Sequence, residues 1–333
     1  MSPDPSAIAG RPVPVPTVDG HAVVALLTGL GLSPHRLDFV AKASTSEVWR
    51  AGTACGPVAV RIAAPHPGKP ADFGAETGLR RVLAAAGAQV AEPLFDRRDR
   101  PDLTVAGHRP AWVVDRWIDG ERADAEAAEA VWRELGAQLA LLHALPVRGH
   151  GRLRADGDGL AGRLDDPDAA AADRFDHPWP FDDLPLADHP LADHPLAETA
   201  PDLIPRLQRL EPAIRRAAAA PPAIVHGDLN GANVRHADGA LTGLIDFADA
   251  TVLTPAWDFA LLRHFQGGPV VDRVLAGYTP DRAAAGRIVR DARLLALVVA
   301  LHHVCRAKLL ELPGRRGYAL GRLRHDLAEI EAG

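Results

Sequence analysis

The sequence predicts an α+β protein in which a strand-rich N-terminal part precedes a mostly helical C-terminal part. Three observations lead to this fold class. Between residues 37 and 117, short apolar runs are bounded by turn residues, which is typical of strands. A single segment within that region has apolar residues at helical spacing. After residue 119, by contrast, most apolar residues recur at helical spacing.

The N-terminal part is predicted to contain five strands and one main helix. Residues 70–86 form the helix, because their apolar side chains lie at helical spacing and a glycine follows the end. Residues 1–18 are rich in proline and small residues and are interpreted as a flexible arm, and Leu26–Gly31 as the end of a short helix. The predicted strands are residues 37–40, 47–50, 58–62, 90–95 and 110–117.

The C-terminal part begins after the break at residues 119–121. Helical spacing predicts helices over residues 126–145 and 203–218 and over most of residues 270–333. Between the first two, residues 149–199 are predicted to be irregular, and 165–198 is interpreted as an acidic, proline-rich insert. The insert contains two copies of Leu-Ala-Asp-His-Pro, which are too few for a repeat protein. The predicted division is therefore an arm over 1–18, an N-terminal lobe over 19–118 and a C-terminal lobe over 119–333.

Composition excludes several classes of protein. The 333 residues are 47% hydrophobic and 24% charged, with a net charge of −6, so a nucleic-acid partner is disfavoured. Cys55 and Cys305 are far apart, which argues against a disulfide framework or a zinc site. The longest apolar run, Leu294–Leu301, is too short to span a bilayer. The N-terminus lacks the pattern of a signal peptide, so we expect a cytoplasmic protein without a membrane partner.

The most informative segment is His226-Gly-Asp228-Leu-Asn-Gly-Ala-Asn233, followed by Leu-Ile-Asp246-Phe. Between them, an Asp-Gly pair at 238–239 joins two short apolar runs and predicts a hairpin that folds Asp246 back beside Asn233. Asp228 can orient and deprotonate a hydroxyl, and the other two side chains offer oxygen ligands for a hard cation such as Mg²⁺. These are the requirements of kinase-type phosphoryl transfer.

This segment resembles the aminoglycoside phosphotransferase and choline kinase group of small-molecule kinases. The positions that match the group's catalytic pattern are His226, Gly227, Asp228, Leu229, Asn233 and Asp246. The run from Thr254 to Asp258 is similar to the group's next element, a proline followed by an aspartate. The resemblance implies a protein-kinase-like, two-lobed fold, with an antiparallel sheet and one main helix in the N-terminal lobe and a mostly helical C-terminal lobe.

The resemblance also implies roles for these side chains. Asp228 would orient the acceptor hydroxyl and accept its proton, and Asn233 and Asp246 would hold Mg²⁺. His226 and Asp258 would support the catalytic loop without reacting. A surface hairpin with no catalytic role is the alternative interpretation of the segment.

A phosphate-binding loop is expected between the first two strands. This chain has Ser44, Thr45 and Ser46 there in place of a glycine-rich motif, and hydroxyl and backbone N–H groups can contact phosphate oxygens. An ordinary hairpin turn is the alternative. The third strand presents Arg61 where a protein kinase has lysine, with Glu76 on the next helix as its ion-pair partner. Exposed surface charges are the alternative for this pair. Arg61→Lys is expected to keep most activity if charge alone matters at this position.

The end of the fifth strand, including Asp115 and Trp117, is predicted to bind the adenine of ATP through its backbone. The sequence does not choose between ATP and GTP. Motifs of other mechanisms are absent: there is no P-loop, no G-x-S-x-G and no H-E-x-x-H.

The predicted function is therefore phosphorylation of a small-molecule hydroxyl, with ATP or GTP and Mg²⁺. The resemblance suggests an antibiotic acceptor, such as an aminoglycoside or macrolide, and resistance by O-phosphorylation. In the acidic insert, Asp165 and Asp166 are candidates to meet a cationic acceptor and Trp179 an apolar one, although a solvated loop is equally open. A kinase of a primary metabolite and a non-catalytic pseudokinase remain alternatives.

Overall fold

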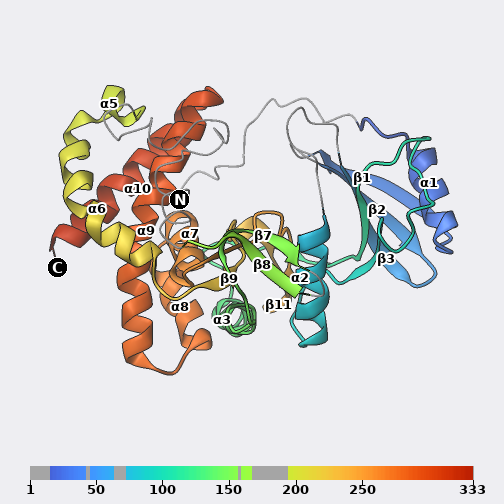
Figure 1. Cartoon of the computed structure of the whole chain (residues 1–333), viewed down its shortest axis with the longest axis horizontal. Coiled ribbons are helices and arrows are strands. Elements are labelled where there is room, and N and C mark those ends of the chain that lie inside the picture. The colour runs from blue at the N-terminus through green and yellow to red at the C-terminus, as the bar shows by residue number, and fades with distance from the viewer. Residues whose placement is uncertain (1–15, 43–45, 64–72, 157–158, 167–193, 333) are drawn as a thin grey trace. The chain divides into compact units, whose positions relative to one another are not determined.

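The structure is a computed structural model, and it describes residues 16–42, 46–63, 73–156, 159–166 and 194–332 (Figure 1). The chain divides into two compact units. The first unit comprises Met1–Asp119 and Thr242–Ala248. The second unit comprises Gly120–Leu241 and Asp249–Gly333. The chain therefore passes between the units three times, and two of these crossings flank the short segment that contains Asp246.

The first unit is built on an antiparallel sheet of five strands, in the order β1-β2-β3-β5-β4. All five predicted strands are present, which confirms the α+β class. The strands are β1 (Arg36–Lys42), β2 (Ser46–Thr53), β3 (Gly56–Ala63), β4 (Pro93–Asp96) and β5 (Trp112–Arg116). Burial alternates along β3, where Val58, Val60 and Ile62 are buried and the residues between them are partly exposed. The sheet therefore has one apolar face and one face that carries other side chains, including Arg61.

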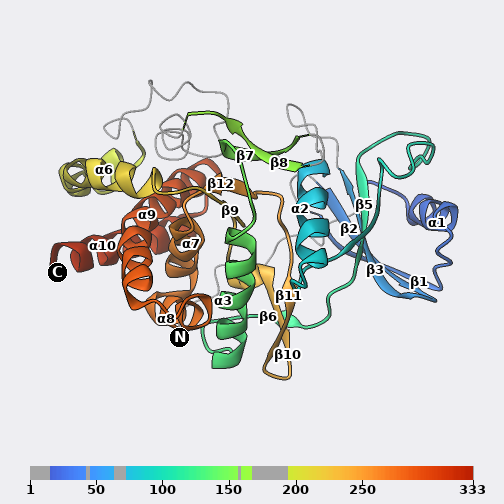
Figure 2. The same ribbon diagram turned by 60° about the horizontal axis from the view of Figure 1, so that its bottom comes forward.

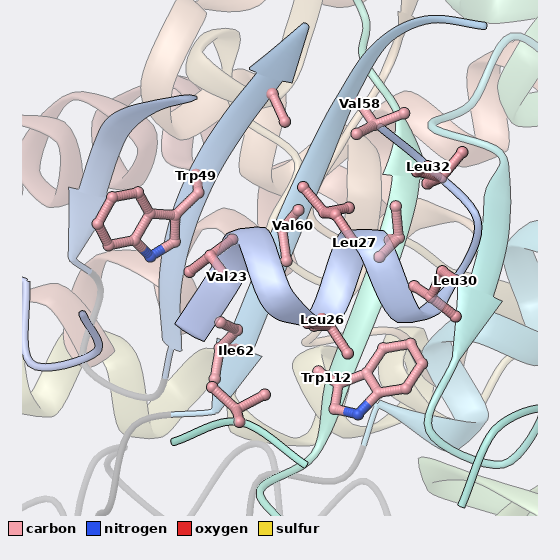
Figure 3. Close-up of a cluster of buried hydrophobic side chains, with 13 residues drawn as sticks. Val23, Leu26, Leu27, Leu30, Leu32, Trp49, Val58, Val60, Ile62 and Trp112 are labelled. Carbon is pink, nitrogen blue, oxygen red and sulfur yellow. The ribbon is translucent and has the colours of Figure 1, made fainter. Parts of the chain in front are cut away.

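The apolar face of the sheet is covered by helix α1 (Gly20–Gly29). Figure 3 shows Val23, Leu26 and Leu27 of this helix lying over Val60 and its neighbours. Each such fully buried side chain contributes roughly 2 kcal/mol. The helix begins six residues before the segment that the sequence analysis had recognised, because Asp19 caps it by accepting a hydrogen bond from the backbone N–H of His21.

The other helix of the first unit, α2 (Gly74–Ala85), agrees with the helix expected over residues 70–86, whose first three residues lie outside the described part. The arm expected over residues 1–18 is described only from residue 16. There, the backbone N–H groups of Thr17 and Val18 donate to the buried carboxylate of Glu47, at 2.6 and 3.1 Å. Burial alone would raise the pKa of Glu47, but these hydrogen bonds outweigh it and hold the pKa below its usual value.

The second unit is mostly helical, as predicted. Helix α3 packs against α8, α7 packs against α9, and α9 packs against α10 (Figures 1 and 2). The helices are α3 (Glu129–His143), α5 (Leu196–Thr199), α6 (Ile204–Ala218), α7 (Ala256–Gln266), α8 (Gly268–Tyr278), α9 (Arg282–Leu309) and α10 (Pro313–Ala332).

Short strands complete the second unit. Strands β8-β7-β12-β9 form one sheet, and a second sheet has the order β11-β10-β6. The strands are β6 (Glu121–Arg122), β7 (His150–Asp156), β8 (Gly159–Leu164), β9 (Ala223–Val225), β10 (Val234–Ala237), β11 (Ala240–Leu244) and β12 (Thr251–Leu253). The last three residues of β11 belong to the first unit.

The hairpin of β7 and β8 corrects the sequence analysis, which expected residues 149–199 to be irregular. The hairpin carries little apolar signal, since Leu153 is the one large apolar side chain in β7. Its place is fixed by tertiary contacts, because β7 pairs with β12, about a hundred residues later in the chain. Gly162 is required there, since a Cβ at this position would lie 2.3 Å from the backbone N of His150.

The contact between α3 and α8 depends on two glycines. A Cβ at Gly277 would lie 1.9 Å from the carbonyl oxygen of Arg133, and a Cβ at Gly136 would lie 2.0 Å from that of Val274. Gly277→Ala should therefore destabilise the protein by about 1–3 kcal/mol, because the helices must move apart. Gly286→Ala is the matched control, since nothing lies within 4 Å of its Cβ position in α9, and it should stabilise slightly. Thermal unfolding measures both, and equal melting temperatures would contradict the close packing.

Two stacked histidines are expected to make the stability of the protein depend on pH. The rings of His264 on α7 and His303 on α9 lie 5.0 Å apart and are nearly parallel. Burial lowers the pKa of His303 to about 4, with Arg306 contributing, and lowers that of His264 well below its usual value. Unfolded histidine has a pKa of about 6.5, so the unfolded state binds more protons between pH 6.5 and 4.

The protein should therefore lose stability as the pH falls through this window, by about 2 kcal/mol at pH 5 from His303 alone. His303→Gln should be less stable at neutral pH but should lose less stability between pH 7.5 and pH 5. His108→Gln, at an exposed position, should keep the wild-type pH dependence. Urea unfolding at both pH values tests this, and identical pH dependence in His303→Gln and wild type would refute it.

Candidate active site

The loop after β9 places the predicted catalytic residues. Strand β9 is buried, and Gly227 follows it with a φ of +82°, a conformation that favours glycine. A Cβ at this position would also lie 2.0 Å from the carbonyl oxygen of Asp249. Asn230 then caps the short helix Gly231–Asn233 by accepting a hydrogen bond from the N–H of Ala232, at 2.9 Å. The glycine and the cap together determine the course of the loop around Asp228.

Asp228 and Asn233 are brought together within this loop. The side-chain amide of Asn233 donates to the carbonyl oxygen of Asp228 at 2.8 Å and to its Oδ2 at 3.3 Å. Asn230 donates to the same carbonyl at 3.1 Å and to Oδ1 at 3.3 Å. The Asp228 carboxylate is thus oriented by two amides and remains partly exposed to solvent.

Asp258, to which the resemblance assigns support of the loop, lies against the backbone of the loop. Its carboxylate is fully buried and accepts the backbone N–H groups of His226 at 2.8 Å and Gly227 at 3.1 Å. It also lies 3.1 Å from Nε2 of His143, whose Nδ1 lies 3.2 Å from the hydroxyl of Tyr278. Because the carboxylate is an acceptor, Nε2 of His143 donates to it. Burial raises the pKa of Tyr278, with Asp258 contributing, which keeps the tyrosine hydroxyl protonated.

The first unit contains the predicted cationic residue. Arg61, on the sheet face opposite α1, donates through Nη2 to Oε1 of Glu76 on α2. Burial disfavours the charge on Arg61, but Glu76, Asp115 and Asp246 outweigh it and raise the pKa of the guanidinium above its usual value. The ring of Phe73 lies 5.0 Å from the guanidinium carbon. Arg61 is therefore a permanent cation that is fixed in place and partly exposed.

Asp246 belongs to the first unit, as an electrostatic neighbour of Arg61. It follows the predicted hairpin of β10 and β11, whose turn residues Asp238 and Gly239 both have positive φ, at 52° and 77°. Asp246 itself has a φ of +63°, which is uncommon for a residue other than glycine, and is exposed. A strained, exposed carboxylate is typical of a functional position. That Asn233 and Asp246 share one metal ion remains a prediction.

The remaining nucleotide-binding candidates have different surroundings. Ser44 and Thr45 lie outside the described residues, and Ser46 is a buried residue of β2, paired with Ala63. Asp115 lies within β5, with its carboxylate directed to arginines. The backbone N–H of Trp117 donates to the carbonyl of Pro57 at 3.1 Å, and that hydrogen bond occupies one of the backbone groups that were expected to bind a base.

The acceptor candidates are described only in part. Asp165 and Asp166 are exposed residues that follow β8, whereas Trp179 and the rest of the acidic insert up to residue 193 lie outside the described residues. Asn230, His143, Tyr278 and Arg80 were not predicted from the sequence. Asn230 lies inside the matched motif, and an asparagine directly before a glycine is a local signal that could have identified it as a capping residue. His143 and Tyr278 gave no local signal, because their partners are distant in the chain. Arg80 lies four residues after Glu76 on the same helix, a spacing at which ion pairs form, but its nearer partner Asp115 is distant in the chain.

A further cluster, His325, Asp326 and Glu329 on α10, has ligand atoms close enough for a metal ion. However, Arg263 already forms ion pairs with Asp326 and Glu329, so a guanidinium occupies this position. Within the described ranges, no helix combines the length and the apolar composition needed to cross a membrane.

Comparisons with known proteins bear on the family and the fold of the chain. The family model described as the phosphotransferase enzyme family matches residues 37–287. No curated protein matches the sequence significantly. Several solved structures are similar. A thermostable mutant of aminoglycoside phosphotransferase APH(4)-Ia, in complex with AMP-PNP and hygromycin B, has a TM-score of 0.65 at 15% identity, over 91% of this chain and 97% of that chain.

Two other solved structures extend the comparison. The GDP complex of aminoglycoside 2'-phosphotransferase-IIIa has a TM-score of 0.60 at 16% identity, over 93% of this chain and 98% of that one. Macrolide 2'-phosphotransferase MphH from Brachybacterium faecium has a TM-score of 0.52 at 16% identity, over 91% and 97%. These likenesses show that the chain has the kinase-like fold of such phosphotransferases.

Proposed function

Because the chain belongs to the phosphotransferase enzyme family, we propose that it transfers the γ-phosphate of ATP or GTP to a hydroxyl of an antibiotic-like small molecule. The observation that best supports this proposal is the loop around Asp228. The carboxylate is held by the amides of Asn230 and Asn233, and the loop is anchored on the buried Asp258. A carboxylate oriented so firmly, yet partly exposed, suits a group that must align a hydroxyl.

In the proposed reaction, Asp228 accepts a hydrogen bond from the acceptor hydroxyl and takes its proton as the phosphoryl group is transferred. The hydroxyl oxygen forms the new bond to phosphorus, and the bond between phosphorus and the bridging oxygen of the nucleoside diphosphate breaks. Asn230 and Asn233 keep the carboxylate directed at the hydroxyl. Arg61, fixed by Glu76, would contact the phosphates of the nucleotide and balance their charge.

Asn233 and Asp246 fit the role of Mg²⁺ ligands. The amide nitrogen of Asn233 is committed to Asp228, which leaves its Oδ1 as the atom available to a cation. Asp246 offers an exposed carboxylate. Both are oxygen ligands, which Mg²⁺ prefers. The metal ion would neutralise charge on the phosphates during transfer.

For the acceptor, we propose a chemical class and not a single compound. The similar structures include enzymes in complex with hygromycin B and kanamycin, and a macrolide phosphotransferase. In this chain, a net charge of −6 and the exposed Asp165 and Asp166 favour a cationic acceptor such as an aminoglycoside. A macrolide, which is larger and more apolar, is the second candidate within the same class.

A panel assay tests the function. Nucleotide hydrolysis and transfer are measured with ATP and with GTP over aminoglycosides, macrolides and metabolic alcohols such as choline and homoserine. Product that carries phosphate on an antibiotic hydroxyl supports the proposal. Transfer to a metabolic alcohol alone would replace it with a metabolite kinase, and nucleotide binding without transfer to any acceptor would indicate a pseudokinase.

A further inference from the structure

Four charged side chains of the first unit form a closed ring of alternating charge, which we call the four-charge cluster: Arg61, Glu76, Arg80 and Asp115. Arg61 pairs through Nη2 with Glu76 and, through Nε at 3.4 Å, with Oδ2 of Asp115. Arg80 pairs through Nη1 with Oδ1 of Asp115 at 2.7 Å and, through Nε at 3.6 Å, with Glu76. Each carboxylate therefore lies between two guanidinium groups, and the ring is neutral.

The four-charge cluster is placed by the spacing of residues on helix α2 and by the pairing of strands β3 and β5. Glu76 and Arg80 are one turn apart on α2, so they project from the same side of the helix. On neighbouring strands, Ala59 pairs with Asp115 and Arg61 pairs with Val113. Arg61 and Asp115 are thus diagonal neighbours on one face of the sheet. The cluster joins two successive turns of α2 to two strands.

Burial separates the role of Arg80 from that of Arg61. The Arg80 side chain is 1% exposed, compared with 13% for Arg61, so Arg80 is enclosed and does not reach a bound nucleotide. Its Nη1 also donates to the carbonyl of Ala91 at 2.5 Å, which ties it to the segment after α2. A charge buried this deeply is costly to desolvate and is retained when it is paired. Its partner Asp115 is the residue that also contacts Arg61.

The shape of arginine explains why position 61 is not a lysine. The guanidinium of Arg61 is planar and broad, so Nη2 donates to Glu76 while Nε lies 3.4 Å from Oδ2 of Asp115, as an ion pair without a hydrogen bond. A lysine has one ammonium on a flexible stem, and it cannot span both carboxylates in a fixed orientation. The orientation of Arg61 is therefore set from two sides, by α2 and by β5.

We propose that Arg80 and Asp115 are positioning residues for nucleotide phosphates: they hold the Nε edge of Arg61, and with it the direction in which Arg61 meets the phosphates. The proposal rests on the proposed function, in which Arg61 contacts the nucleotide. It assigns Asp115 a role through its carboxylate, which is separate from the backbone contact to adenine that its position in the sequence had suggested.

The test removes the second pair without leaving an unpaired charge. In the double variant Arg80→Met/Asp115→Leu, apolar side chains of similar size replace a buried pair, an exchange that proteins often tolerate. The affinity for ATP, measured by calorimetry, should fall about tenfold, because Arg61 keeps its hydrogen bond to Glu76 but loses the negative charge of Asp115 beside its Nε. The affinity for adenosine, which has no phosphates, should not change. Asp115→Asn, which keeps the shape and loses the charge, should show the same selective loss.

Substitution of Arg61 by lysine tests the positioning role independently. Arg61→Lys should weaken ATP binding nearly as much as Arg61→Ala in the wild-type background, but should cost clearly less in the double variant, where the second anchor is already gone. Arg81→Met is the matched control, because Arg81 is the next residue of α2, is itself 38% exposed, and pairs with Asp96 and Asp99, which lie outside the four-charge cluster. It should bind ATP as wild type does.

The outcomes of these experiments distinguish a failure of the positioning role from a failure of the proposed function. A folded double variant or Asp115→Asn with unchanged ATP affinity would overturn the positioning role and leave the proposed function intact. Equal losses of ATP and adenosine affinity would also overturn it, since they would indicate a general loosening of the unit. Absence of nucleotide binding by the wild-type protein would refute the proposed function, and this proposal with it.

Discussion

Asp228→Asn is expected to lower turnover by about 10²–10⁴-fold, the usual contribution of a general base. The substitution keeps the size of the side chain, and Asn233 can still donate to the carbonyl oxygen of residue 228. The affinity for the nucleotide should therefore stay within a few-fold of wild type. Steady-state assays with the best acceptor of the panel, together with calorimetry for ATP, measure the two quantities separately.

The control for this variant is Asp202→Asn, the same exchange at an exposed position that precedes α6. It should have wild-type kinetics. Near-normal turnover in Asp228→Asn would remove this residue from the mechanism. Loss of both turnover and nucleotide affinity, with a lower melting temperature, would assign Asp228 a structural role instead.

Asp246→Ala is expected to abolish Mg²⁺-dependent nucleotide binding, because the carboxylate that would hold the metal ion against the phosphates is lost. Calorimetry with ATP, with and without Mg²⁺, measures the effect. The backbone at this residue needs a separate control. Alanine in the left-handed region costs about 1 kcal/mol, so a loss of binding in Asp246→Ala alone has two possible causes.

Asp246→Gly separates these causes, since glycine adopts a φ of +63° without strain. If Asp246 is a metal ligand, the glycine variant should lose Mg²⁺ dependence as completely as the alanine variant. Recovery of Mg²⁺-dependent binding in Asp246→Gly would show that the conformation of the backbone, and not the carboxylate, is what nucleotide binding requires. Asp272→Ala, at an exposed position on α8, should bind as wild type does.

Much of the fold was predictable because its signals are local. Strands β2 and β3 alternate buried and partly exposed residues, α2 has helical spacing, and the Asp-Gly turn at 238–239 has the two positive φ angles that its sequence favours. The loop around Asp228 was predictable for the same reason. Gly227 supplies a turn with positive φ and Asn230 caps a residue two positions later, so the motif carries its own turn and its own cap. The close approach of Asp249 to Gly227, by contrast, depends on the tertiary structure.

The sequence by itself therefore determined the α+β class, the order of the elements and the segment that carries Asp228, Asn233 and Asp246. Only the tertiary structure decided which distant side chains support that segment. His143 meets Asp258 across 115 positions and Tyr278 across 135, and neither histidine nor tyrosine stands in a pattern of its own.

The positions of the β7–β8 hairpin and of Arg80 were likewise decided only by the tertiary structure. The hairpin has few apolar residues and is placed by its pairing with β12. In the sequence, Arg80 is one polar residue of a helix, and its ion pair with Asp115 on β5 forms only in the folded chain. The physical reason is common to all three. Periodicity and turn chemistry depend on neighbours in the chain, whereas buried ion pairs, close backbone contacts and strand pairing depend on neighbours in space, which the folded chain alone brings together.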